Sequence, residues 1–205
     1  MNKPLNIILL GDPAAGKATQ AKFLLNKHKL LDLDMGREMR LILNGKGSAS
    51  VRKALKETTN KGKLAPTEIV RAIHKEKILS ARKNKGILLD GTPKMIGEAK
   101  LVYKWMQQVK RTPESTIALY LHIPEKEVLK RAKDRVEYFK GKFSKRPDDT
   151  VDSLKNRIKY YRKNIAQVVS FFKTKYYYKE INGLGSRTEV KNRIDKVISE
   201  FLKHA

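Results

Sequence analysis

The sequence contains no cysteine and no apolar run near the roughly 18 residues that a membrane-spanning helix needs. Without cysteine there can be no disulfide framework and no thiolate zinc site. The four histidines are scattered and do not show ligand spacing. The first residues lead into a strand-like run rather than a signal-peptide pattern. We therefore expect a cytoplasmic protein with no structural zinc and no membrane partner.

Acidic residues are also scarce, because 21 Asp and Glu stand against 46 Lys and Arg, a formal net charge of +25. Such an excess can neutralise the phosphates of a nucleic acid. Here the basic residues are spread along the whole chain, and no compact module for reading bases is present. A general bias of the surface is favoured, and a nucleic-acid partner stays possible.

Apolar runs of strand length alternate with longer helical patterns along the chain. The strands expected are 5–10, 87–89, 116–123 and 176–181, with a short fifth near 30–33. The helices expected are 17–27, 49–60, 66–83, 96–109, 125–139, 151–173 and 186–203. This alternation is typical of a parallel α/β sheet. Since linkers and repeats are absent, residues 1–205 are expected to form one domain.

Residues 11–19 read Gly-Asp-Pro-Ala-Ala-Gly-Lys-Ala-Thr, directly after the first apolar run. A strand followed by a glycine-containing loop and a lysine is typical of a P-loop, whose backbone N–H groups bind phosphate oxygens. Gly11 and Gly16 permit the tight turn, and Lys17 reaches the outer phosphates as a point charge. The helix over 17–27 directs its positive N-terminal dipole at them. The sequence therefore predicts binding of a nucleoside triphosphate.

Residues 86–94 form a second strand-like segment that is relevant to the same site. Its apolar run is followed by Asp90, a glycine and a proline. In an open α/β sheet, ligands bind beyond the carboxyl ends of the strands. Asp90 is therefore expected beside the P-loop, where it can hold magnesium directly or through water.

These motifs together resemble those of the adenylate kinases, within the nucleoside monophosphate kinase family, over nearly the whole chain. Residues 11–20 resemble the family's phosphate loop, and residues 86–94 resemble its Gly-Phe-Leu-Leu-Asp-Gly-Phe-Pro-Arg segment. Two further family segments fall on residues 35–40 and 62–68 at matching spacing. The resemblance implies a P-loop parallel five-stranded sheet flanked by helices, with a helical acceptor-binding insert over 35–65 and a short lid over 135–146.

The family's lid arginines resemble Arg131, Arg135, Arg146 and Arg157 of this chain. Ten residues separate Arg135 from Arg146, as in short-lid members, which lack the zinc-binding insert and are commonly monomers. Arginines around a migrating phosphoryl group stabilise its charge.

The resemblance also assigns roles to individual residues. The donor ATP is expected to contact Gly11, Ala14, Ala15, Gly16, Lys17, Ala18, Thr19 and Arg131. The acceptor is expected to contact Met35, Gly36, Arg40, Leu64, Ala65, Gly91, Lys94, Glu98, Arg146 and Arg157. Catalysis is assigned to Lys17, Lys94, Arg135, Arg146 and Arg157, and hydrated Mg²⁺ to Asp90.

Departures from the family pattern fall mainly on the acceptor side. Lys94 stands at a family arginine, Glu98 at the glutamine that reads adenine, Met35 at a threonine and Thr92 at a phenylalanine. Lysine keeps the charge of arginine but loses its bidentate geometry, and an ionised glutamate offers acceptors only. In the phosphate loop, Ala14 and Ala18 replace glycines.

The activity expected is reversible phosphoryl transfer from Mg-ATP to AMP, which gives ADP. A kinase for GMP, CMP or UMP is the enzymatic alternative, because the base-contacting residues differ. A weakly catalytic basic P-loop protein that binds RNA or a protein partner is the alternative from another class.

Overall fold

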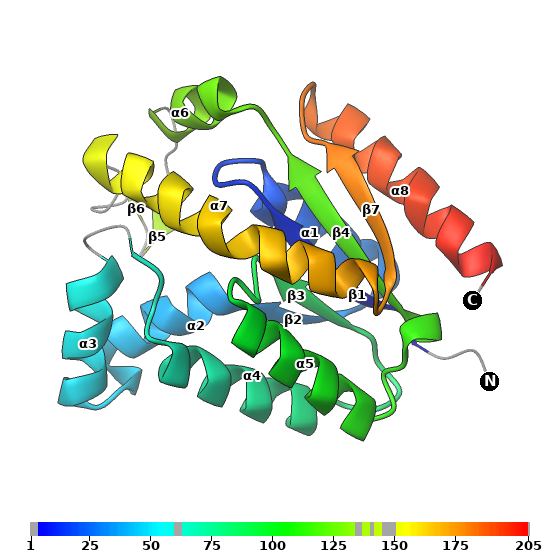
Figure 1. Cartoon of the computed structure of the whole chain (residues 1–205), viewed down its shortest axis with the longest axis horizontal. Coiled ribbons are helices and arrows are strands. Elements are labelled where there is room, and N and C mark those ends of the chain that lie inside the picture. The colour runs from blue at the N-terminus through cyan, green and yellow to red at the C-terminus, as the bar shows by residue number, and fades with distance from the viewer. Residues whose placement is uncertain (1–3, 60–62, 134–136, 140–141, 145–150, 205) are drawn as a thin grey trace.

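The computed structural model describes residues 4–59, 63–133, 137–139, 142–144 and 151–204. Its centre is a five-stranded sheet in the order β2-β3-β1-β4-β7, and every neighbouring pair is parallel (Figure 1). The strands are β1 (Asn6–Gly11), β2 (Leu31–Asp34), β3 (Ile87–Asp90), β4 (Thr116–His122) and β7 (Tyr177–Asn182). The predicted parallel sheet is confirmed, including its short fifth strand.

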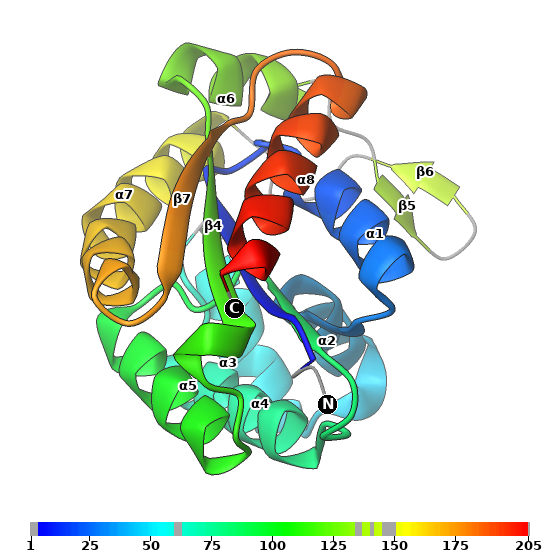
Figure 2. The ribbon, with the colours of Figure 1, turned by 90° about the vertical axis from the view of Figure 1, so that its right-hand side faces the viewer.

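Helices cover both faces of this sheet (Figure 2). One face is covered by α1 (Lys17–His28) and α8 (Arg187–Lys203), and the other by α4 (Thr67–Ser80), α5 (Ile96–Gln108) and α7 (Val151–Lys173). Between β2 and α4 lie α2 (Met35–Leu41), a π-helical turn (Ile42–Lys46) and α3 (Ala49–Thr59). A 3₁₀ turn (Pro113–Ser115) precedes β4, and α6 (Glu125–Lys133) follows it.

The sheet divides the core into two apolar clusters, one under each helical layer. Along β1, Ile8 and Leu10 face the α4–α5–α7 layer, and Ile7 and Leu9 face the α1–α8 layer. A strand that is buried on both faces needs a continuous apolar run, which is what its sequence provides. Each such side chain contributes about 1.5–3 kcal/mol on burial. β1 and its neighbours are therefore a rigid base for the loops at their carboxyl ends.

The helix predicted over 125–139 is wrong in its last part. It ends at Lys133, and Glu137–Phe139 forms β5, which pairs antiparallel with β6 (Lys142–Ser144). Aromatic residues on both short strands, paired as Tyr138 opposite Phe143, favour strand over helix. The helix predicted over 66–83 begins at Thr67 and ends at Ser80, and Pro66 is its cap rather than its first turn.

Periodicity gave no helix between residues 35 and 48, where α2 and the π-helical turn lie. Asp34 starts α2, because its carboxylate accepts a hydrogen bond from the Arg37 N–H. Within the part of the chain that the structure describes, no helix combines the length and hydrophobicity needed to cross a membrane.

Candidate active site

The carboxyl ends of β1, β2 and β3 meet at one edge of the sheet. Strand register places Asp90 of β3 opposite Leu9 of β1 and opposite Asp34 of β2. The N–H of Gly91 donates to the carbonyl of Leu9 over 2.9 Å, which fixes the segment after β3 beside the loop after β1. This is the edge at which open α/β sheets bind their ligands.

The phosphate loop between β1 and α1 uses three residues with positive φ: Gly11 at 152°, Ala14 at 57° and Gly16 at 91°. A Cβ at Gly11 would lie 2.5 Å from the carbonyl oxygen of Leu121, so only glycine fits against β4 there. Ala14 holds a left-handed conformation that costs an L-residue about 1–2 kcal/mol. Ala18 lies within α1, where alanine is favourable. Of the two alanines that replace family glycines, only Ala14 therefore has an unfavourable backbone conformation.

Lys17 is the first residue of α1, and its Nζ donates to the carbonyl oxygens of Gly11 and Asp12 over 2.7 Å each. A Cβ at Gly91 would lie 3.5 Å from Cε of Lys17, so the lysine stem passes the end of β3. The ammonium group therefore lies between the phosphate loop and the segment that follows Asp90.

Asp90 is partly buried, and burial is the main reason why its pKa rises to about 6. The charge of Lys17 opposes the rise, and the carboxylates of Asp34 and Asp32 add to it. A carboxylate in negative surroundings is a suitable oxygen ligand for Mg²⁺. Across the described ranges, no three or more His, Cys, Asp or Glu side chains form a group that could hold a metal ion. This donor set fits an ion that keeps water and nucleotide phosphates as its other ligands.

On the acceptor side, Arg40 of α2 lies beside Asp34, with 3.6 Å between Nη2 and Oδ2. Gly36 fits closely beneath this arginine, since a Cβ there would lie 3.1 Å from its Nη1. The side chain of Met35 is only 4% exposed and belongs to the core beside β2. Ala65 packs against the same core, and Leu64 is partly buried. The structure thus brings Arg40 to the strand ends and places Met35 in the interior.

Glu98 closes the N-terminus of α5, because its Oε2 accepts from the N–H groups of Lys94 (3.1 Å) and Met95 (3.3 Å). It is 3% exposed, and burial raises its pKa while these two bonds lower it. Its observed role is therefore helix capping. That it also contacts the base of an acceptor stays a prediction.

A buried pair supports the segment between Asp90 and Lys94. The hydroxyl of Thr92 lies 2.7 Å from Nε2 of His74 on α4, and both side chains are fully buried. Burial lowers the pKa of His74 to about 4, so its ring is neutral near pH 7. No pattern in the sequence indicates this pair, because the partners are 18 residues apart and meet only when the chain folds.

Of the four predicted lid arginines, Arg131 is described in full. Its Nε donates to Oε1 of Glu127 (2.7 Å), and its Nη1 donates to the carbonyl oxygen of Gly183 (3.1 Å). A Cβ at Gly183 would lie 3.5 Å from the carbonyl oxygen of Ala15, so Arg131 lies near the phosphate loop. For Arg157 the structure gives its place on α7, while Arg135 and Arg146 lie outside the described residues.

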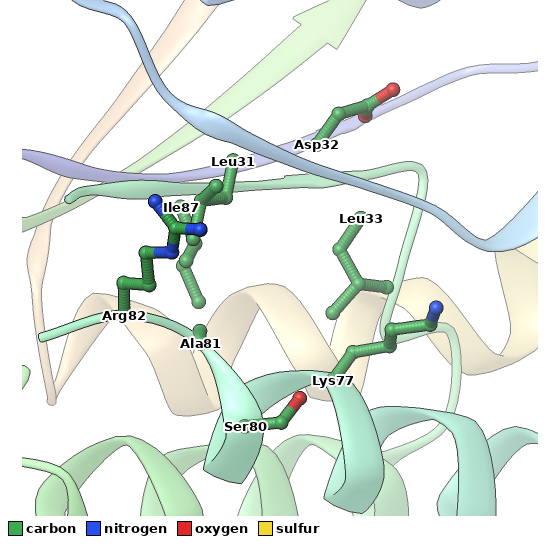
Figure 3. Close-up of a pocket in the computed structure, with 8 residues that line it drawn as sticks. All are labelled: Leu31, Asp32, Leu33, Lys77, Ser80, Ala81, Arg82 and Ile87. Atoms are coloured by element: carbon green, nitrogen blue, oxygen red, sulfur yellow. The ribbon is translucent and has the colours of Figure 1, made fainter.

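A hollow of about 250 Å³ lies elsewhere, at the outer edge of β2 and the end of α4 (Figure 3). It is lined by Leu31, Asp32, Leu33, Lys77, Ser80, Ala81, Arg82 and Ile87. None of the residues that we predicted for the site is among them. The candidate site is therefore the edge formed by the strand ends, and this hollow is separate from it.

A glycine-containing loop between a buried strand and a helix N-terminus, beside a strand-end carboxylate, defines a P-loop protein. A family model described as "Adenylate kinase" matches residues 9–177. The chain belongs to this family, as its motifs predicted.

Its relatives agree with this assignment. An adenylate kinase of Flavobacterium psychrophilum is 30% identical over 96% of this chain and all of its own length. One of Elusimicrobium minutum is 30% identical over 94% of this chain and 98% of its own length. One of Parabacteroides distasonis is 27% identical over 95% and 98%, respectively. The resemblance thus spans almost the complete length of these relatives.

Proposed function

We propose that this protein transfers the terminal phosphoryl group of Mg-ATP to AMP and so forms two molecules of ADP. The observation that carries the proposal is the phosphate loop, with Lys17 lying between it and the end of β3. Membership of a family whose relatives are named adenylate kinase supports the acceptor.

The donor phosphates would bind the N–H groups of residues 14–19 at the start of α1, and Lys17 would exchange its two carbonyl partners for phosphate oxygens. Asp90 would hold Mg²⁺ through water, and the bound ion would neutralise charge on the phosphates. The attacking phosphate oxygen of the acceptor is already anionic, so the reaction needs no general base. Catalysis then depends on alignment and electrostatics.

The acceptor phosphate would lie between Arg40 and Lys94, which follow Asp34 and Asp90 in the sequence by six and four residues, respectively. Gly36, Leu64, Ala65, Gly91 and Glu98 stay candidates for contact with the acceptor nucleoside. Met35 enters this group only through its backbone, since its side chain lies in the core. A preference for GMP, CMP or UMP is the alternative that the departures on this side favour.

The insert, the lid and the arginines complete the proposed site. The acceptor-binding insert spans 35–65 and the short lid spans 135–146, with Arg135, Arg146 and Arg157 around the transferring group. Arg131 would stack on the donor base, which its position beside Gly183 and the phosphate loop supports. We further propose that the chain acts as a cytoplasmic monomer, which sedimentation and fractionation test.

The test is ADP formation by the purified chain with Mg-ATP and a panel of AMP, GMP, CMP and UMP. We expect rapid turnover with AMP and its loss in Lys17→Ala. Turnover with another acceptor alone would replace AMP in the proposal. Absence of turnover with every acceptor would refute the proposed activity and favour the RNA-binding or partner-binding alternative.

A further inference from the structure

Asp12 is a buried carboxylate inside the phosphate loop that the proposed mechanism does not use. It is 3% exposed and lies next to Gly11, at the point where the loop leaves β1. A buried carboxylate costs several kcal/mol unless it is hydrogen-bonded and paired. Because it lies beside a site for anionic phosphates, this carboxylate needs hydrogen-bond partners from other elements of the fold.

These partners come from the end of β4. Oδ1 accepts from the hydroxyl of Tyr120 over 3.0 Å, and Oδ2 accepts from the N–H of Ile123 over 3.0 Å. Nδ1 of His122 also lies 3.0 Å from Oδ2. Each oxygen is thus satisfied by groups on β4 and the residue that follows it. The carboxylate therefore faces the end of β4.

A second tyrosine closes a ring of hydrogen bonds. The N–H of Gly11 donates to the hydroxyl of Tyr161 on α7 over 3.1 Å, and the hydroxyls of Tyr161 and Tyr120 are hydrogen-bonded. The chain of donors runs from the Gly11 N–H through Tyr161 and Tyr120 to the Asp12 carboxylate. Gly11 and Asp12 are consecutive, so both ends of the chain hold the same turn of the backbone.

This turn carries the loop's functional parts. The carbonyl of Asp12 accepts from the N–H of Ala15 (3.2 Å) and from Nζ of Lys17 (2.7 Å). Between them Ala14 holds its unfavourable positive φ. A displacement of Asp12 would therefore move both the loop N–H groups and the carbonyl that orients Lys17.

The ring also reaches the helix that carries a predicted lid arginine. Arg157 precedes Tyr161 by four residues on α7, about one helical turn. In Figure 1, α7 runs across one face of the sheet, from the edge where β1 and β4 end to the start of β7.

We infer that Asp12 is a positioning residue, which fixes the phosphate loop to β4 and, through Tyr120 and Tyr161, to α7 in the geometry that binds ATP. This inference rests on the proposed function for its ligand. Because the ring holds the phosphate loop directly and none of its members is an expected contact of the acceptor, its loss should weaken ATP binding more than AMP binding.

The experiment measures the Kd of ATP and of AMP by calorimetry for the full chain and for Tyr120→Phe, Tyr161→Phe and their double variant. The bond that Tyr161 accepts joins neutral groups, so Tyr161→Phe should weaken ATP binding by about three- to tenfold. Tyr120 donates to a carboxylate, whose hydrogen bonds are stronger, so Tyr120→Phe should weaken it more. Because both substitutions break one chain, the double variant should be much less impaired than the product of the single effects.

Tyr176→Phe is the matched control, since its hydroxyl is buried and has no hydrogen-bond partner in the described part of the chain. We expect it to bind ATP as the unchanged protein does. Asp12→Asn is a second probe. Its NH₂ group would face one of the two donors and break that hydrogen bond, so ATP binding should weaken. ATP affinity unchanged in the tyrosine variants, or reduced equally for ATP and AMP, would overturn the inference.

Calorimetry separates this inference from the proposed function. If the unchanged protein binds ATP but forms no ADP with any acceptor, the proposed activity fails while the ATP-binding effects still decide the role of Asp12. If the unchanged protein does not bind ATP, both fail.

Discussion

The donor and acceptor sides of the candidate site depart from the family in different ways. On the donor side, the substitutions at Ala14 and Ala18 change the backbone's freedom but leave the N–H groups and Lys17 in place. On the acceptor side, Lys94 and Glu98 change the functional groups themselves. A loop that binds through backbone N–H groups tolerates changes of side chain that a side-chain site does not. The donor side therefore keeps the family's binding groups, whereas the acceptor side does not.

Hydrogen bonding differs between the two sides as well. The phosphate loop is held by contacts to β4 and α7, elements distant in sequence. On the acceptor side, Glu98 caps its own helix and Asp34 caps α2, both local interactions. The exception is the pair of Thr92 and His74, which ties α4 to the segment before Lys94.

The largest effect is expected for Lys17→Ala, which removes the cation expected to bind the outer phosphates of the donor. Turnover should fall by about 10²–10³-fold, the usual cost of losing one electrostatic contact to the transition state. Steady-state ADP formation measures it. Lys22→Ala on the exposed face of α1 is the control, and an equal loss there would refute a specific role for Lys17.

Acid should weaken the acceptor side through His74. Its pKa is about 4 in the folded protein against 6.5 when unfolded, so the unfolded state binds more protons between these values. The stability from neutral His74 is complete above pH 6.5 and is lost as the pH falls through about 4, by about 3 kcal/mol in total. Urea unfolding of the protein and of His74→Gln at pH 7 and pH 4.5 measures it. An equal loss in both proteins would contradict the assignment.

The contribution of the hydrogen bond between Thr92 and His74 can be measured against Thr116, a second buried threonine. Thr92→Val leaves Nε2 of His74 without its partner and should cost about 1–3 kcal/mol. Thr116→Val, equally buried but without a hydrogen bond to Oγ1 among the described residues, should be neutral or stabilising. Denaturant unfolding of both variants gives the difference, and equal losses would refute the bond's contribution.

Restoring family residues on the acceptor side should sharpen the comparison. Lys94→Arg together with Glu98→Gln should lower the KM for AMP by about three- to tenfold, because arginine binds phosphate bidentately and glutamine donates as well as accepts. Glutamine can still accept at the start of α5, so the helix should remain capped. The KM for ATP is the internal control. Unchanged kinetics with AMP would count against this assignment of the acceptor side.

The smallest effects are expected in the free energy of unfolding when the two alanines of the donor side are replaced by glycine. Ala14→Gly relieves a positive φ and should raise the free energy of unfolding by up to about 1 kcal/mol. Ala18→Gly, the same substitution inside α1, should lower it by about 0.5–1 kcal/mol. Thermal unfolding compares them, and shifts of the same sign would contradict the loop geometry.

The sequence predicted what depends on local pattern. Alternating strands and helices gave the parallel sheet, and the loop at Lys17 and the strand end at Asp90 gave two parts of the site that the fold brings together. Glu137 to Phe139 were wrongly placed in a helix, because a three-residue strand exists only by pairing with β6. The ring from Asp12 to Tyr161 was equally out of reach, since its members meet only through the packing of β4 and α7.

The most direct test of the account follows the phosphoryl group itself. The protein is incubated with Mg-ATP labelled at the γ-phosphate, with and without AMP, and the labelled products are separated. We predict that label enters ADP only when AMP is present. Label released as inorganic phosphate, or the absence of labelled ADP when AMP is present, would contradict the claim that this edge of the sheet transfers a phosphoryl group from ATP to AMP.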